Sequence, residues 1–204
     1  MKRATATSKK VEQGDATREA LLAAARRLFG SQGYAATSLD EIAGAAGVTK
    51  GALYHHFTGK QQLFRAVFEA VKKEVSGETF PRGVANDDIW LDLISRCKAF
   101  IENHTKPDVQ RIVLIDARSV LSWDDWHKID SDYGIVLLRA TLRRATNRGI
   151  LDPQPLNALA MMVGGALAEA CLLVANAEDR ASTIEEAMAI IERLLIGLRS
   201  NMGE

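Results

Sequence analysis

The segment Thr37–Phe64 restricts the fold of this chain most strongly, because it carries start and stop signals for two short helices joined by a tight turn. Ser38 and Glu41 stand at the spacing of a capping box, which predicts a helix beginning just after Ser38. Gly47 is placed to end that helix, since glycine adopts the left-handed conformation without a steric penalty. Thr49 can cap the next helix. The segment therefore predicts a helix-turn-helix.

The second predicted helix has one apolar side and a polar leading edge. Leu53 and Phe57 can pack against the first helix, so the opposite side faces outward. In helix-turn-helix proteins the second helix lies in the major groove of DNA, and its first residues meet base edges. The candidates for this edge are Thr49, Lys50, Gly51 and His55, with Tyr54 also facing outward, and Lys50 could equally reach a phosphate. The candidates for phosphate contacts are Lys60, at the start of the following helix, and Thr37 and Ser38, at the start of the first helix.

The run GVTKGALYHHFTGKQQLF, at residues 47–64, resembles the DNA-binding signature of the TetR (tetracycline-repressor) family of bacterial regulators. The resemblance covers roughly residues 15–70 and includes Phe29, Gly33–Tyr34, Ile42, Ala43 and His56 as further matching positions. It implies an N-terminal helical domain that reads DNA and a variable second domain. It also implies that the hydroxyl of Tyr54 contacts a phosphate.

Composition supports an all-α fold, because strand signals are scarce while Ala, Leu, Glu and Arg dominate the periodic stretches. The net charge is zero, but residues 1–75 hold 12 Lys and Arg against 7 Asp and Glu, and residues 76–204 hold 14 against 19. A basic first third and an acidic remainder suit a protein that presents one end to nucleic-acid phosphates.

The expected organisation has four parts: a disordered basic arm at 1–14, a helix-turn-helix domain at 15–60, a linking helix at 61–77 and a larger helical domain at 78–204 for ligand binding and dimerisation. The arm could add phosphate contacts or be a solvated tail. Further helices are expected at Thr17–Gln32, from Lys60 to about Gly77, from Asn86, after Pro107, at Asp124–Arg148 and Leu156–Asn176, and after a capping box of Ser182 and Glu185.

The chain is expected to work in the cytoplasm, away from membranes. Cys97 and Cys171 lack metal-ligand spacing and fit reduced, buried thiols, and no secretory signal is evident at the start. The stretch Ala158–Ala177 is apolar enough to raise the question of a membrane span. Glu169 and two central glycines favour a buried helix instead.

The last two predicted helices are candidates for a homodimer surface, since their apolar stripes are wide and the run VGGALAEA allows close helix approach. The alternative is that both helices complete the core of one chain; dimerisation is favoured mainly through the resemblance. The candidate interface residues are Leu167, Ala170, Cys171, Val174, Met188, Ile191, Leu195 and Leu198.

Repressors of the resembled family usually carry an inducer pocket in the second domain. Aromatic side chains with a few polar groups suit an amphipathic or apolar small molecule. The candidate pocket residues are Trp90, Cys97, Phe100, His104, Trp123, Trp126, Tyr133, Leu137, Met161 and Met162. No cofactor and no metal site are expected. A metal site at His55 and His56 is not favoured, because adjacent helical residues point about 100° apart.

The favoured function is a ligand-responsive dimeric repressor that reads a pseudo-palindromic operator in double-stranded DNA and is released by a small effector. One alternative is a ligand-responsive activator. A less favoured alternative is a helical enzyme that uses Asp124, Asp125 and His127, although adjacent acids before a helix are more simply an N-cap and first-turn charge.

Overall fold

The structure is a computed structural model that describes residues 2–81 and 87–199, with side chains from residue 13 onward. Residues 82–86, which include the predicted helix start at Asn86, lie outside the described residues. The elements in chain order are α1 (Lys2–Ala36), α2 (Leu39–Ala45), α3 (Lys50–His56), α4 (Lys60–Thr79), α5 (Ile89–His104), α6 (Pro107–Val109), the π-helix η1 (Gln110–Asp116), α7 (Ala117–Val120), α8 (Trp123–Asp130), the π-helix η2 (Ser131–Ile135), α9 (Val136–Asn147), α10 (Leu156–Ala175) and α11 (Arg180–Ile196). Within these residues the only strand-like pairing is an isolated bridge between Leu151 and Arg199, so the fold is all-α as predicted.

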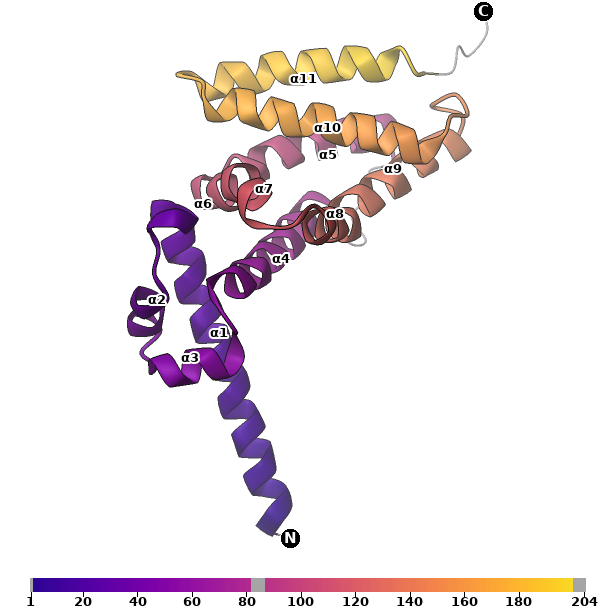
Figure 1. Cartoon of the computed structure of the whole chain (residues 1–204). Helices are drawn as coiled ribbons and strands as arrows, with labels where there is room; N and C mark the ends of the chain where they lie inside the picture. The colour runs from indigo at the N-terminus through magenta and orange to yellow at the C-terminus, as the bar shows by residue number, and fades with distance from the viewer. Residues whose placement is uncertain (1, 82–86, 200–204) are drawn as a thin grey trace, which may run out of the picture.

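The molecule has a small head and a larger body (Figure 1). The helices α1, α2 and α3 form the head, from which the first part of α1 projects. α4 runs from the head into the body, where α10 and α11 lie side by side as an outer layer over α5 and α9. A change in the body can therefore reach the head through α4.

The helix-turn-helix forms through the local signals that its sequence carries. The Glu41 backbone N–H donates to Oγ of Ser38 at 3.1 Å, and the Ser38 N–H donates to the Glu41 carboxylate at 2.7 Å, which completes the capping box. Gly47 has φ 67°, and the Val48 N–H reaches back to the carbonyl of Ala43 at 3.0 Å, as in a Schellman ending. These interactions confirm the predicted start and end of α2.

The first helix differs from its prediction at one end and agrees at the other. Gly33, with φ 86° and ψ 165°, interrupts the helix where the sequence predicts its end. Residues 2–14 are helical, whereas the sequence predicts a disordered arm. The segment contains no proline and a single glycine, so it can extend a helix that the packed turns from residue 21 onward have nucleated.

Two apolar clusters hold the chain together, and the first crosses the boundary expected near residue 78. It joins residues of α1–α4, such as Phe29 and Phe64, to residues of α6–α8, including Val109, Ile112 and Ala117. The second cluster contains α5, α9, α10 and α11. The head is therefore packed directly on part of the body.

The body contains two π-helical segments that the sequence did not predict. The helix expected at Asp124–Arg148 is present as α8, η2 and α9 in direct succession, and η1 lies between α6 and α7 in the same way. The last helix begins earlier than predicted, because Asp179 caps it by accepting from the Ser182 N–H at 3.1 Å. The expected capping box of Ser182 and Glu185 is wrong.

The candidate dimer residues need correction. Seven of the eight, all except Leu198, are buried within the chain's own core, and Leu198 is partly buried against it. Gly164 also faces inward, because a Cβ there would lie 2.8 Å from Cδ1 of Ile135. The apolar stripes of α10 and α11 thus pack one chain together, and a wide stripe alone does not tell an internal contact from an external one.

The helix α10 is the one described element that is long and apolar enough to cross a membrane by length and composition, with a mean hydropathy of 2.0. It packs against α5, α9 and α11, and 44% of its most apolar window is buried. It is thus a core helix with one uncovered side, which matches the prediction of a buried helix.

Candidate nucleic-acid interface and internal cavity

The outward side of α3 is built from polar and aromatic residues on a rigid base. Leu53 and Phe57 are buried against the rest of the head, so the orientation of the helix is fixed. Thr49 caps α3 by accepting from the Ala52 N–H at 3.2 Å. Lys50, Gly51, Tyr54 and His55 are all exposed on the other side, as the sequence predicts.

Two of the outward residues already have contacts within the head. The ammonium group of Lys50 lies 2.8 Å from a carboxylate oxygen of Asp40 on α2. The ring of His55 lies edge-on to that of His56, with centroids 5.4 Å apart. A phosphate or base that takes Lys50 must therefore compete with Asp40.

The residues proposed for phosphate contacts differ in their exposure. Ser38 is exposed, with its hydroxyl bonded to Glu41 at 2.7 Å. Thr37 is buried, and its hydroxyl donates to the carbonyl of Gly33 at 2.8 Å. The side chain of Thr37 holds the end of α1, so its assignment as a DNA contact is corrected.

Lys60 turns back toward the head. Its ammonium group lies 4.3 Å from the centroid of the Tyr34 ring and donates to the carbonyl of Ala35 at 3.3 Å. No side chain caps the start of α4, whose first N–H groups are free of side-chain partners within the described residues. The start of α4 thus offers backbone donors as well as a lysine.

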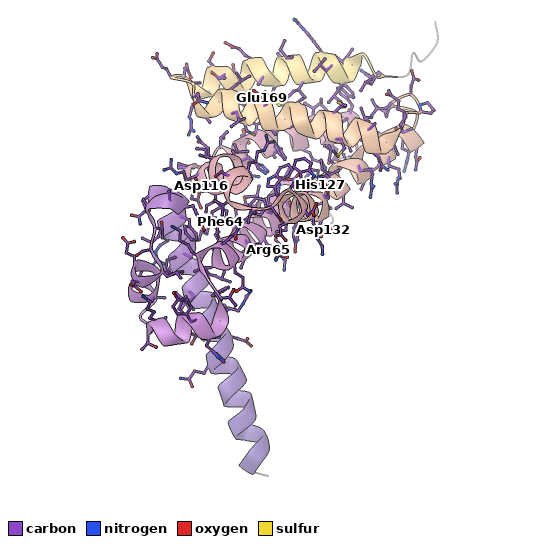
Figure 2. The ribbon with its side chains drawn as sticks, in the orientation of Figure 1. Phe64, Arg65, Asp116, His127, Asp132 and Glu169 are labelled. Atoms are coloured by element: carbon purple, nitrogen blue, oxygen red, sulfur yellow. The ribbon has the colours of Figure 1, made fainter. Side chains whose placement is uncertain are left out.

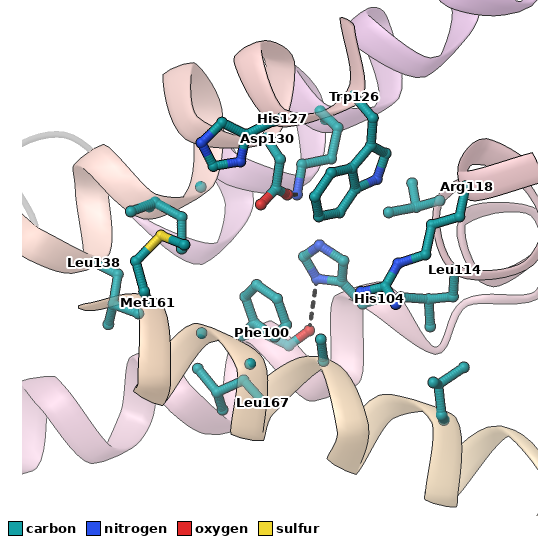
Figure 3. A pocket seen from close by; sticks show the side chains of 18 of the residues that line it. Phe100, His104, Leu114, Arg118, Trp126, His127, Asp130, Leu138, Met161 and Leu167 are labelled. Atoms are coloured by element: carbon teal, nitrogen blue, oxygen red, sulfur yellow. Dashed lines mark hydrogen bonds and ion pairs between the residues drawn. The ribbon is translucent and has the colours of Figure 1, made fainter. Parts of the chain in front are cut away.

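The body encloses a cavity of about 220 Å³ between α4, α5, η1, α7, α8, η2, α9 and α10 (Figure 3). Six of the predicted pocket residues line it: Cys97, Phe100, His104, Trp123, Trp126 and Met161. Four do not: Trp90 stacks with Arg199, Tyr133 packs near the head and bonds Glu69, Met162 is exposed, and Leu137 lies outside the wall.

His104 is the most unusual group in this wall. It is buried, and its Nδ1 lies 2.9 Å from the carbonyl oxygen of Phe100, one turn back on α5. Burial, with the nearby charge of Lys72, lowers the pKa of His104 to about 3. The imidazole is therefore neutral at neutral pH.

Comparisons with known proteins agree on one family. Residues 21–67 match the family described as bacterial regulatory proteins, tetR family, and residues 90–198, more than half of the chain, match the tetracyclin repressor-like C-terminal domain. The chain belongs to the TetR family. Its helix-turn-helix is thus that of a DNA-binding transcriptional regulator, and the family is one of regulators, not enzymes.

Some relatives of this TetR-family chain match nearly its whole length, whereas others match only a segment of about 60 residues. A crystal structure of a TetR-family transcriptional regulator from Pectobacterium atrosepticum is 34% identical with a TM-score of 0.78, over 92% of this chain and 96% of that one. The transposon Tn10 TetC protein of Escherichia coli is 26% identical over 92% of this chain and 95% of its own length. The regulator AcrR of Shigella flexneri is 45% identical over 64 residues, which is 31% of this chain and 30% of AcrR.

The cavity wall of this TetR-family regulator holds an ion pair of a buried lysine that was not predicted from the sequence. Lys72 is 2% exposed, and its ammonium group lies 2.7 Å from a carboxylate oxygen of Asp130. The available signal was its position on α4, where Phe64, Phe68 and Lys72 share one face at i, i+4 and i+8. A lysine on a buried stripe indicates an internal partner.

Two residues of the enzyme alternative, Asp125 and His127, have contacts within the TetR-family fold. Ser122 caps α8, and Asp125 accepts from Arg65 on α4 at 2.9 Å, which holds the pKa of Asp125 below its usual value. Asp124 is exposed, and His127 stacks on Trp123. Among the described residues no cluster of His, Cys, Asp and Glu could hold a metal ion.

The π-helix η1 touches both the cavity and the DNA-binding head. Val113 and Leu114 line the cavity. Asp116, at the end of η1, accepts from the Tyr34 backbone N–H at 2.8 Å, next to the end of α1 (Figure 2). A guanidinium N–H of Arg111 donates to the carbonyl of Gln32 at 3.4 Å. One short element thus connects the regulator's cavity to its head.

Proposed function

We propose that this TetR-family regulator is a dimeric repressor that holds a pseudo-palindromic operator until a small amphipathic or apolar effector enters the body. The observation that carries the proposal is the cavity, since its wall includes residues of α4 and η1 and both elements also contact the head. A ligand that changes their position alters the placement of α3.

The coupling follows from the two connections. α4 starts at Lys60 in the head and brings Lys72 to the cavity wall, about 18 Å further along the helix axis. η1 is π-helical, a rare conformation that frequently occurs at functional sites, and it is anchored to the end of α1. An effector that prefers one arrangement of these elements shifts the population toward heads that no longer match the operator.

The proposed dimer surface is the uncovered side of the outer layer. Met162 and Leu173 of α10 and Ile190 and Leu194 of α11 are each more than half exposed. Large apolar side chains left exposed on one layer indicate an association surface in a soluble protein. A second copy packed there joins two heads, so that both contact one operator.

In the bound state α3 lies in the major groove, with Lys50 and His55 toward base edges and Tyr54 toward a phosphate. Ser38, Thr49 and Lys60 line the two sides of this contact. The two α3 helices of the dimer are expected about 34–36 Å apart, one turn of DNA.

The test begins with selection of operator sequences from random duplex DNA by the full chain. Binding of the selected operator should weaken steeply with salt, because phosphate contacts release counterions. Lys50→Ala should lower affinity about tenfold, with either a salt slope smaller by about 1 or a changed base preference.

The matched control is Lys98→Ala, since Lys98 is a similarly exposed lysine on α5, away from the head. This variant should bind like the wild type. Equal affinities of the Lys50 variant and the wild type at every salt concentration would remove Lys50 from the interface, and failure to select any operator would count against the repressor proposal.

A further inference from the structure

The chemistry of the cavity wall restricts the effector, if the cavity is the effector site that the proposed function requires. His104 fixes the first restriction. A carbonyl oxygen can only accept, so the short contact with Phe100 requires the proton of the neutral imidazole to be on Nδ1. Nε2 then carries a lone pair, and it is buried without a hydrogen-bond partner among the described residues.

Nε2 faces the space between α5 and α8. Figure 3 shows the His104 ring in the middle of the cavity, with Nδ1 bonded toward Phe100 and the other nitrogen turned toward the side of Asp130 and Trp126. The exposed fraction of His104 is 3%, so the group that satisfies Nε2 has to come from within the cavity. That group must be a hydrogen-bond donor, because the neutral ring offers only an acceptor there.

Lys72 fixes the second restriction. Its ammonium group has three N–H donors and lies 2.7 Å from Asp130, in the same cavity wall. A ligand atom that donates to His104 and accepts from Lys72 suits both groups. A hydroxyl oxygen does this, whereas a carboxylate cannot donate and a cationic amine is repelled by Lys72.

The rest of the wall determines the size and the apolar character that a ligand must have. The Phe100 ring stacks on His104 with centroids 3.8 Å apart, and Trp126, Leu138 and Leu167 continue an apolar and aromatic lining. A volume of about 220 Å³ lies below the roughly 300–1,000 Å³ of pockets that hold drug-sized molecules. The space therefore suits a flat molecule of one or two rings.

We propose that the effector is an uncharged aromatic molecule of one or two rings with a hydroxyl group, and that this hydroxyl donates to Nε2 of His104 and accepts from Lys72. The ring lies against Phe100 and Trp126. Arg118, which is exposed and stacks on Trp126, lies at the edge of the cavity.

The experiment compares three probes by calorimetry on the full chain. 2-Naphthol, its methyl ether and 2-naphthoate share the naphthalene rings and differ only in the group at position 2. The wild type should bind 2-naphthol at least tenfold more tightly than either of the others. The ether keeps the rings and loses the donor, and the naphthoate replaces the hydroxyl by an acceptor-only anion. This comparison uses only the wild-type protein, so its result does not depend on the folding of a variant.

Variants locate the hydrogen bond. His104→Phe keeps a ring against Phe100 and removes the acceptor, so it should weaken naphthol binding to the level of the ether and change ether binding by less than about threefold. His127→Phe, at the other histidine of the wall, should keep the preference for naphthol. The proposal is overturned if naphthol and ether bind the wild type equally, if naphthoate binds most tightly, if none of the three binds, or if His104→Phe keeps the preference.

Release of operator DNA, followed by fluorescence anisotropy, separates this inference from the proposed function. Naphthol that binds as expected without releasing DNA leaves the ligand chemistry intact and contradicts the effector role. Release by a molecule without a hydroxyl group, in a protein that ignores naphthol, supports the repressor and overturns the ligand class.

Discussion

Two polar side chains in the cavity wall, His104 and Lys72, are almost fully buried, and their hydrogen-bonding groups are satisfied differently. Lys72 has a carboxylate partner, Asp130, at 2.7 Å. His104 has one of its two nitrogens satisfied, and the other is left to the cavity. A buried polar atom without a partner costs about 1–3 kcal/mol, so an apolar residue would give a more stable protein at this position. The cost is expected where a group is kept for binding.

The low pKa of His104 predicts a specific dependence of stability on pH. The pKa falls from 6.5 to about 3 on folding, so between these values the unfolded chain binds one more proton than the folded chain. Stability from this group is therefore fully present above pH 6.5 and is lost as the pH falls toward 3. Between pH 7.5 and pH 5 the loss should reach about 2 kcal/mol.

His104→Phe provides the comparison, with urea unfolding measured at one protein concentration. The other titratable and charged groups of the wall are present in both proteins, so their contributions largely cancel; they are Lys72, Arg96, Cys97, Arg118, His127 and Asp130. Relative to the wild type, the free energy of unfolding of the variant should rise by about 2 kcal/mol as the pH falls from 7.5 to 5. Parallel pH profiles would show that His104 is not buried in the neutral form.

At the scale of elements, the junction between α1 and η1 depends on a backbone conformation that glycine supplies. Gly33 lies at φ 86° and ψ 165°, a region populated almost solely by glycine, and a Cβ would lie 2.7 Å from a guanidinium nitrogen of Arg111. Gly33→Ala should therefore lower the free energy of unfolding by about 1–3 kcal/mol. Urea unfolding at fixed protein concentration measures it.

The control for this substitution is Gly77→Ala. Gly77 lies within α4 and is not at positive φ, and a Cβ added there would have no atom of a neighbouring group within 4 Å. Alanine there should raise stability by up to about 1 kcal/mol, because it favours the helix. If both variants lose the same stability, the conformation of Gly33 does not constrain the junction.

The same junction shows which elements the sequence could predict. The caps at Ser38 and Thr49 and the turn at Gly47 depend on partners within five residues, so short-range patterns predict them correctly. The contact between Asp116 and the Tyr34 N–H joins residues 82 positions apart, and no local pattern indicates it. The early start of α11 was missed because two cap signals, Asp179 and Ser182, compete within four residues.

The candidate sites follow the same rule. The outward side of α3 was predicted correctly in its exposure, because helical period and the buried Leu53 determine it. Thr37 was assigned to DNA although tertiary packing buries it. The pocket residues Cys97, Phe100 and His104 follow one another at about one turn on one face of α5 and were predicted together, while Trp90, at the start of the helix, packs elsewhere.

At the scale of the whole molecule, α10 and α11 carry apolar residues on their exposed side as well as on their buried side. The sequence therefore did not show which of these residues face the chain's own core, and the inward ones were predicted as an interface. Met188, Ile191 and Leu195 are buried and Ile190 and Leu194 are exposed, so α11 is apolar on two sides. Large apolar side chains that the chain's own core leaves exposed are candidates for a contact with another molecule. In the proposed dimer, a second copy covers this outer side.

Leu194→Asp tests this assembly, because it places a charge in the middle of the exposed apolar side without disturbing the chain's own core. The variant should sediment as a monomer at micromolar concentration, where we expect the wild type to sediment as a dimer. Operator affinity should fall by about 100-fold or more, since the second head is no longer held at high effective concentration. The affinity of the full-length variant for a duplex that holds a single half-site should equal that of one wild-type chain.

Leu91→Asp is the matched control, with the same substitution at an exposed leucine of similar accessibility on α5, which is not part of the outer layer. It should remain a dimer with wild-type operator affinity. A Leu194 variant that stays dimeric and binds the operator normally would place the interface elsewhere. One head makes too few contacts with DNA to bind an operator tightly alone. A variant that becomes monomeric yet keeps full operator affinity would therefore contradict the pseudo-palindromic mode of binding.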